Sequence, residues 1–209
     1  MKEKHASSLP VQSADDGRNP LRAVVALHGD TGNRYSMKPV SVGCRCRGTR
    51  WYFPEAPFEL ESAGQHTWWQ KSSGPIDFRP AFTVLDTTLE QVVRDGIPRQ
   101  RTVLLGFSQG ACLTLEYGLR TDSLGGLVAI AGFLTDKERL AREQNPASRQ
   151  TPILILHGTR DKIVPPEQGR ATRDQLMGWG YEVQWSSYAA GHKIPLPAMN
   201  TIRQFLQVL

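Results

Sequence analysis

The pentapeptide at residues 106–110, Gly-Phe-Ser-Gln-Gly, has the residue types of a turn that exposes a nucleophilic serine. An apolar run at 103–105 leads into it and a helix-like segment at 111–119 leads out, which is the order strand, sharp turn, helix. Such a turn strains the backbone of Ser108 and projects its hydroxyl above the sheet. Glycine at both ends suits a place where strand and helix pass too close for a Cβ. The spacing predicts that Ser108 is a nucleophile.

A base and an orienting acid must accompany this serine, because its hydroxyl is a poor nucleophile at neutral pH. In the strand–turn–helix arrangement the three groups follow the chain order serine, acid, histidine. Only His192 follows Ser108 in a loop after the last predicted strand. Asp161 lies between them in a loop after a strand, and Asp136 is the alternative because it also follows a strand. The order favours Asp161 and His192.

The oxyanion of such a reaction needs backbone N–H donors. The first should be the N–H of Gln109, the residue after the nucleophile, and the second should come from the loop after the first strand, at residues 28–31. Gly29 would let that backbone approach the substrate. His28 and His157 end strands directly before glycines. We interpret both histidines as structural residues that brace loops rather than as catalysts.

The elements that must position these residues can be predicted from the apolar pattern. Continuous apolar runs are typical of strands that are covered on both faces, as in a parallel sheet. Six such runs occur, at 23–27, 51–53, 102–105, 127–130, 153–156 and 183–188. Helical patterns lie between or after them, at 82–96, 111–119, 166–178 and 199–209. This alternation predicts an α/β fold, a mostly parallel open sheet of about six strands with helices on both faces, and functional loops at the carboxyl ends of the strands.

Length and composition predict one domain. The chain has 209 residues, of which 39% are hydrophobic, enough for one well-buried core. We expect a single domain at residues 21–209 behind a flexible N-terminal tail at 1–20. The tail lacks the apolar centre of a signal peptide, and the longest nearly apolar stretch, 125–134, is far below the ~20 residues that a membrane span needs. These features predict a cytoplasmic protein with no stable membrane insertion.

The positive charges are concentrated in one window. The net charge is +5, and no acid lies between Asp30 and Glu55, where the window at 34–50 contains Arg34, Lys38, Arg45, Arg47 and Arg50. Two interpretations stay open: a solvated basic loop, or a weak contact with anionic lipid surfaces or acidic substrates. No nucleic-acid-binding motif is present, so nucleic acid is not an expected partner.

The cysteines predict neither a disulfide framework nor a metal site. There are three, an odd number. Cys44 and Cys46 lack a second ligand pair at a convincing spacing. Cys112 lies one turn into the helix that follows Ser108, where we expect simple packing.

Five motifs in the same order resemble the phospholipase/carboxylesterase branch of the α/β-hydrolases, which includes the acyl-protein thioesterases. The similarity runs from about residue 23 to the end of the chain. The motifs are LHGDTG at 27–32, FPEAP at 53–57, GFSQG at 106–110, LHGTRDKIVP at 156–165 and GHKIP at 191–195. The resemblance implies an α/β-hydrolase fold with Ser108 as nucleophile, Asp161 as orienting acid and His192 as base.

Two regions depart from the family pattern. The first loop is two residues short, because Gly29 runs directly into Asp30 and Thr31. The second oxyanion donor is therefore assigned to the Asp30 N–H, with Thr31 next, and Gly29 and Thr31 are expected beside the substrate. The segment from 29 to 57 is also short, which predicts a truncated first helix. Trp68 and Trp69 stand where the family lines its acyl or leaving-group pocket; they could bind substrate, or one of them could simply pack in the core.

The resemblance implies a serine esterase that acts on a small-molecule or lipid ester through an acyl-enzyme, without cofactor or metal. A thioester or a lysophospholipid fits the same machinery. The alternatives are a peptidase, a dienelactone-type hydrolase, or a binding protein that kept the fold and lost activity. Nothing in the sequence indicates an oligomeric state.

Overall fold

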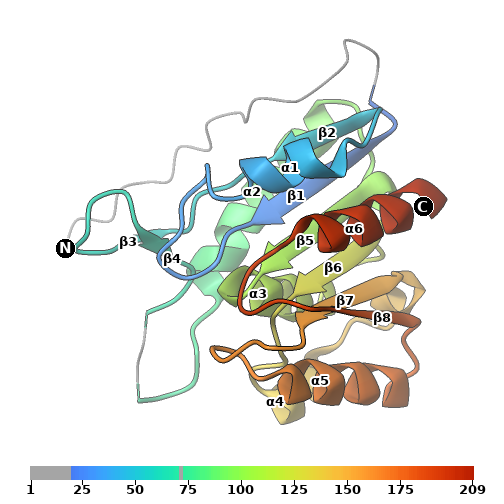
Figure 1. Cartoon of the computed structure of the whole chain (residues 1–209). Helices are drawn as coiled ribbons and strands as arrows, with labels where there is room; N and C mark the ends of the chain where they lie inside the picture. The colour runs from blue at the N-terminus through green and yellow to red at the C-terminus, as the bar shows by residue number, and fades with distance from the viewer. Residues whose placement is uncertain (1–19, 71–72) are drawn as a thin grey trace.

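The computed structural model describes residues 20–70 and 73–209, so the predicted tail lies outside the described residues except for Pro20. Its centre is a six-stranded sheet in the order β2-β1-β5-β6-β7-β8 (Figure 1). All five neighbouring pairs are parallel. The strands are β1 (Arg22–Leu27), β2 (Thr49–Tyr52), β5 (Thr102–Phe107), β6 (Gly126–Ile130), β7 (Ile153–Gly158) and β8 (Val183–Tyr188). The predicted parallel sheet of six strands is confirmed.

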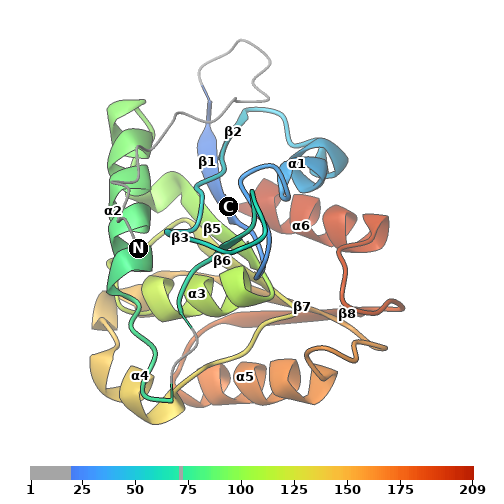
Figure 2. The ribbon, with the colours of Figure 1, turned by 90° about the vertical axis from the view of Figure 1, so that its left-hand side faces the viewer.

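Six α-helices lie within the described residues and cover both faces of the sheet. They are α1 (Lys38–Cys44), α2 (Arg79–Arg94), α3 (Gln109–Gly118), α4 (Lys137–Glu143), α5 (Pro166–Gly178) and α6 (Leu196–Val208). The helices α1 and α6 share one core with one face of the sheet, and α2 to α5 share a second core with the other (Figure 2). Two short 3₁₀ helices, η1 (Arg99–Arg101) and η2 (Pro146–Gln150), precede β5 and β7.

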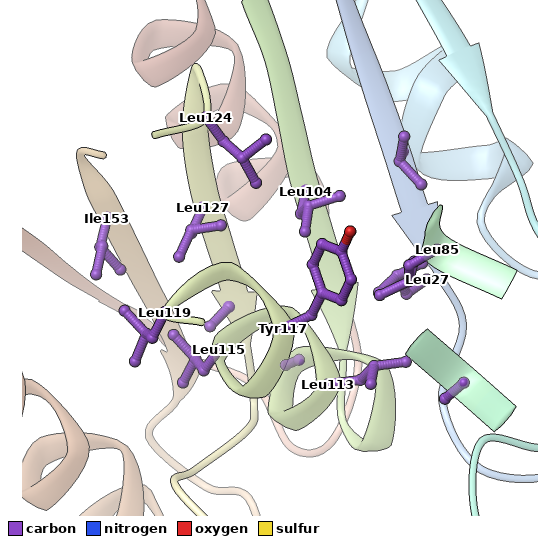
Figure 3. Packing of buried hydrophobic residues seen from close by; sticks show 14 of the residues in the cluster. Leu27, Leu85, Leu104, Leu113, Leu115, Tyr117, Leu119, Leu124, Leu127 and Ile153 are labelled. Atoms are coloured by element: carbon purple, nitrogen blue, oxygen red, sulfur yellow. The ribbon is translucent and has the colours of Figure 1, made fainter. Parts of the chain in front are cut away.

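The two cores explain why the strands read as continuous apolar runs. In β5, Val103 and Leu105 belong to the core under α1 and α6, whereas Leu104 points into the opposite core. Figure 3 shows Leu104 among Leu115 and Tyr117 of α3. Because both faces of the strand are covered, alternate side chains are buried in either direction and no polar face is needed.

Two elements were not predicted, a short hairpin and α4, whereas α1 lies in the segment where a truncated first helix was expected. A two-stranded antiparallel hairpin joins β3 (Phe58–Glu59) to β4 (His66–Thr67), and α1 and α4 are helices of seven residues each. All are too short to show a clear apolar period, so tertiary contacts determine them. In the helical pattern predicted at 199–209, Met199, Ile202 and Phe205 are buried, whereas Leu209 lies beyond the end of α6 and is exposed.

Candidate active site

Ser108 occupies the sharp turn between β5 and α3. Its backbone angles are φ 55° and ψ −116°, a strained region for a residue with a side chain, and its N–H donates to the Ile130 carbonyl at 2.8 Å. A Cβ at Gly106 would overlap the Gly110 carbonyl, and one at Gly110 would overlap the Leu27 carbonyl. The close approach of strand and helix therefore requires glycine at these two positions.

His192 reaches Ser108 from the loop between β8 and α6. Its Nε2 lies 2.9 Å from the Ser108 Oγ, and its Nδ1 lies 2.7 Å from the Asp161 Oδ2. The ring also packs against Phe107, with the two centroids 4.7 Å apart. Three side chains from separate strand ends thus form one chain of hydrogen bonds. If Nδ1 carries the proton that Asp161 accepts, Nε2 has a free lone pair to take the serine proton.

Asp161 follows β7 and is held by its own turn. Its Oδ1 accepts the backbone N–H groups of Ile163 and Val164 at 2.9 and 3.0 Å, which leaves Oδ2 for His192. Burial would raise the pKa of Asp161, but the hydrogen bonds from His192, Val164 and Ile163 outweigh it and hold the pKa below its usual value. The carboxylate is therefore ionised at neutral pH.

The alternative acid, Asp136, has a different role in the structure. It is the N-cap of α4, where its side chain accepts the Arg139 N–H at 2.9 Å. The two strand-end histidines brace loops. His157 is buried and its Nε2 lies 2.9 Å from the Val164 carbonyl, so it supports the Asp161 turn. The His28 Nε2 accepts the Ala56 N–H at 3.2 Å.

The region where an oxyanion would sit lies between the start of α3 and the loop after β1. Within the part of the chain that the structure describes, the Gln109 N–H has no acceptor, as befits the first turn of a helix. A Cβ at Gly29 would come 3.3 Å from the Ser108 Cβ, so this loop passes directly beside Ser108. Asp30 and Thr31 form the turn that follows, and Thr31 has a φ of 63°.

The two tryptophans differ in exposure. Trp68 is completely buried: its backbone N–H donates to the Gln109 Oε1 at 2.9 Å and its indole N–H donates to the His28 carbonyl at 2.8 Å. It therefore ties the segment after β4 both to the start of α3 and to the loop after β1. Trp69 is only partly buried and packs edge-to-face on Phe78. Of the pair, Trp69 retains surface for a substrate, and its role stays a prediction.

An ion pair in the loop after β1 was not predicted from the sequence. Arg34 and Glu55 form a two-pronged ion pair of 2.7 and 3.0 Å, and the Arg34 N–H also donates to Glu55 at 2.9 Å. Burial would raise the pKa of Glu55, but the Arg34 contacts lower it. The pair fastens the loop after β1 to the segment after β2. The two residues are far apart in the chain, and no local pattern signals their contact.

Comparison with known proteins identifies the family of this chain. The family model described as Phospholipase/Carboxylesterase matches residues 11–209, nearly the whole chain. The chain belongs to this phospholipase/carboxylesterase family.

Relatives and solved structures agree with this membership. An acyl-protein thioesterase 1 from Gibberella zeae is 37% identical over 123 residues, which are 57% of this chain and 52% of that relative. Thus the chain matches about half the length of this relative, whereas the match to an acyl-protein thioesterase 1 from Debaryomyces hansenii, 28% identical, covers 94% and 97%. The crystal structure of esterase PE8 superposes with a TM-score of 0.79 at 27% identity and covers 96% of both chains. SOBER1 from Arabidopsis thaliana, at 24% identity and a TM-score of 0.77 over 90% of this chain and 98% of its own, shares the fold.

Two further observations concern other site types. Among the described residues, no group of three or more His, Cys, Asp or Glu side chains is placed to hold a metal ion, and all three cysteines are free. In the same part of the phospholipase/carboxylesterase chain, no helix has the length and apolar character needed to cross a bilayer.

Proposed function

We propose that this chain is a serine hydrolase that cleaves carboxylic esters, with Ser108 as nucleophile, His192 as general base and acid, and Asp161 as the orienting carboxylate. The observation that carries the proposal is the pair of hydrogen bonds from Ser108 Oγ to His192 Nε2 and from His192 Nδ1 to Asp161, at 2.9 and 2.7 Å. Family membership supports the reaction type.

The first half of the reaction acylates the serine. His192 Nε2 takes the Ser108 proton while Oγ adds to the substrate carbonyl carbon, and Asp161 stabilises the imidazolium that forms. The oxyanion is held by the N–H groups of Gln109 and Asp30, with Thr31 the alternative second donor; one such donor is typically worth ~10²–10³ in turnover. His192 then gives its proton to the leaving alcohol, and the carbon–oxygen bond to that group breaks.

The second half releases the acid. His192 takes a proton from water as the water oxygen adds to the acyl carbon, and the proton passes to Ser108 Oγ as the acyl bond breaks. The products are one carboxylic acid and one alcohol, and the enzyme returns to its starting state. No step requires a metal or cofactor. A thioester follows the same sequence with a thiol as the leaving group.

The substrate is a small-molecule or lipid ester, and a thioester or a lysophospholipid is the finer proposal. Similar proteins named acyl-protein thioesterase 1 support the thioester. Gly29, Thr31 and the partly exposed Trp69 line the proposed substrate path, with Trp68 supporting it from below.

The test compares Ser108→Ala with Ser123→Ala, a serine that the site does not use. A panel of p-nitrophenyl esters of increasing chain length and one acyl thioester should be hydrolysed by the parent and by Ser123→Ala. Ser108→Ala should lose about 10⁶-fold in turnover, as expected when the nucleophile of such a triad is removed.

A fluorophosphonate probe gives an independent measurement. We expect a covalent adduct at Ser108, identified by peptide mass, in the parent and in Ser123→Ala. Turnover retained in Ser108→Ala would overturn the mechanism. Absence of both an adduct and turnover in the folded parent would instead favour a binding protein that has lost activity.

A further inference from the structure

Four arginines converge at the edge of the sheet opposite to Ser108, where the parallel strands begin. Arg22 begins β1, Arg45 and Arg47 lie in the turn between α1 and β2, and Arg203 lies in α6. Together with Thr49 they line a cavity of about 470 Å³. Burial raises the pKa of the Cys46 thiol in this cavity, while the charges of Arg22 and Arg203 act against that rise, so both guanidinium groups lie near one sulfur.

These arginines have no carboxylate partner among residues 20–70 and 73–209. The chain has no Asp or Glu at residues 31–54 or 183–209, which include α1, the turn after it and α6. Arg34 and Arg50, from the same basic window, do pair, with Glu55 at 2.7 Å and Asp95 at 3.5 Å. The window thus divides into paired arginines that fasten the fold and arginines that face a cavity and have no carboxylate partner in the described residues.

Thr49 is an independent sign that a ligand belongs there. Its side chain is 1% exposed, and its Oγ1 is buried without any hydrogen-bond partner in the described part of the chain. An unpaired buried hydroxyl costs about 1–3 kcal/mol, so native structures usually satisfy it. Because Thr49 lines the same cavity, a rotation of its side chain would open the hydroxyl to an oxygen-rich anion between the arginines, which could accept its hydrogen bond.

An apolar groove continues from this cavity along the seam between α1 and α6, which lie side by side in Figures 1 and 2. The groove has a volume of about 870 Å³ and shares Arg45 and Arg203 with the arginine cavity. Its exposed walls include Val42 and Leu196, each 68% exposed, and Tyr35. Exposed apolar side chains gathered in one groove mark an interaction site.

We propose that this face binds an anionic phospholipid of a membrane surface, with the phosphate held by Arg22, Arg45, Arg47 and Arg203 and the hydrocarbon laid along the α1–α6 groove. A phosphate is the natural ligand of clustered guanidinium groups, because their planar N–H pairs match its oxygens. A free phosphate would leave the adjoining groove empty, whereas a lipid occupies both halves. This binding is separate from ester cleavage, because the cavity lies at the amino ends of the strands and the serine at their carboxyl ends.

Vesicle co-sedimentation tests the proposal in the Ser108→Ala background, so that no lipid is hydrolysed and the readout is independent of catalysis. The protein should bind phosphatidylcholine vesicles that contain phosphatidylglycerol and bind pure phosphatidylcholine only weakly. The double variant Arg47→Gln/Arg203→Gln should lose about 30-fold in affinity, since each basic residue at an anionic surface contributes about 5-fold.

The matched control is Arg94→Gln/Arg142→Gln, which removes the same charge from α2 and α4 on the other face of the sheet. It should leave vesicle binding within about 3-fold of the parent. If circular dichroism shows that Arg203→Gln perturbs the fold, Arg45→Asn/Arg47→Gln replaces the test pair; asparagine tolerates the left-handed conformation of Arg45, whose φ is 49°.

A groove variant separates a lipid from a free anion. Val42→Ser/Leu196→Ser should weaken vesicle binding several-fold and leave the binding of inorganic phosphate, measured by calorimetry, unchanged. Three results would overturn the proposal: equal loss in the two arginine pairs, no preference for phosphatidylglycerol, or vesicle binding that the groove variant does not alter and inorganic phosphate abolishes.

Discussion

Polar side chains differ between the carboxyl edge of the central sheet, where the parallel strands end, and the amino edge, where they begin. At the carboxyl edge, Ser108, His192 and Asp161 satisfy one another, and two backbone N–H groups hold the carboxylate. At the amino edge, the arginines around Arg47 lack a partner in the described residues and Thr49 has an orphaned hydroxyl.

The difference indicates which kind of ligand each edge suits. A closed chain of hydrogen bonds is preorganised, and in the proposed function it acts on an uncharged carbonyl. Clustered, unpaired cations repel one another, and an anion from outside would relieve that repulsion.

Asp161→Asn should cause the largest loss of activity, because it disrupts the chain of hydrogen bonds at the carboxyl edge. An asparagine can donate to His192 Nδ1 and so favour the tautomer that carries its proton on Nε2, which cannot accept the serine proton. We expect kcat on p-nitrophenyl esters to fall about 10⁴-fold with little change in the fold. Asp136→Asn, at the N-cap of α4, is the control and should retain near-parental kcat. A mild loss in Asp161→Asn would mean that Asp161 does not orient His192.

Low pH should remove the contribution that the Asp161 carboxylate makes to the free energy of unfolding. The pKa of Asp161 is lowered in the folded protein, so the unfolded chain takes up a proton at this group first as the pH falls. The stabilisation is complete above the unfolded pKa of about 3.9 and is lost as the pH falls from there through the folded pKa. Urea unfolding at pH 6 and below pH 4 should therefore show a smaller acid-induced loss in Asp161→Asn than in the parent. Equal losses would contradict the lowered pKa.

Two arginine substitutions should give the smallest changes in the free energy of unfolding. They distinguish an arginine that is paired from one without a carboxylate partner in the described residues. Arg34→Gln removes the two-pronged pair with Glu55 and should lower the free energy of unfolding by about 1 kcal/mol at low salt. Arg47→Gln removes a charge that has no carboxylate partner in the described residues, and it should change the free energy of unfolding by less than about 0.5 kcal/mol. Urea unfolding at two salt concentrations measures both. A large loss in Arg47→Gln would show that its charge is already compensated.

Much of the architecture could be predicted because it depends on local pattern. The four inner strands β1, β5, β6 and β7 are short, mostly apolar runs, because both of their faces are buried, whereas the edge strand β8 is mixed in sequence and only partly buried. The hairpin of β3 and β4 and the helix α4 could not be predicted, and the short helix α1 was expected only from the family resemblance, since segments this short are stabilised by what they pack against.

The order of Ser108, Asp161 and His192 along the chain was enough to select these residues as candidates, because the strand–turn–helix pattern fixes where a nucleophile and its partners can lie. Only the tertiary structure decided that Trp68 is a buried brace and that Asp136 caps a helix. The choice depends on neighbours that come from distant segments.

The sequence by itself determined most of the strands, the turn at Ser108 and the concentration of basic residues, because each of these features depends on residues that are adjacent in the chain. The tertiary structure alone decided which of those basic residues are neutralised. Arg34 meets Glu55, whereas Arg45 and Arg47 meet Arg22 and Arg203. The reason is topological: a parallel sheet gathers the starts of its strands at one edge, and α6 returns beside them from the far end of the chain.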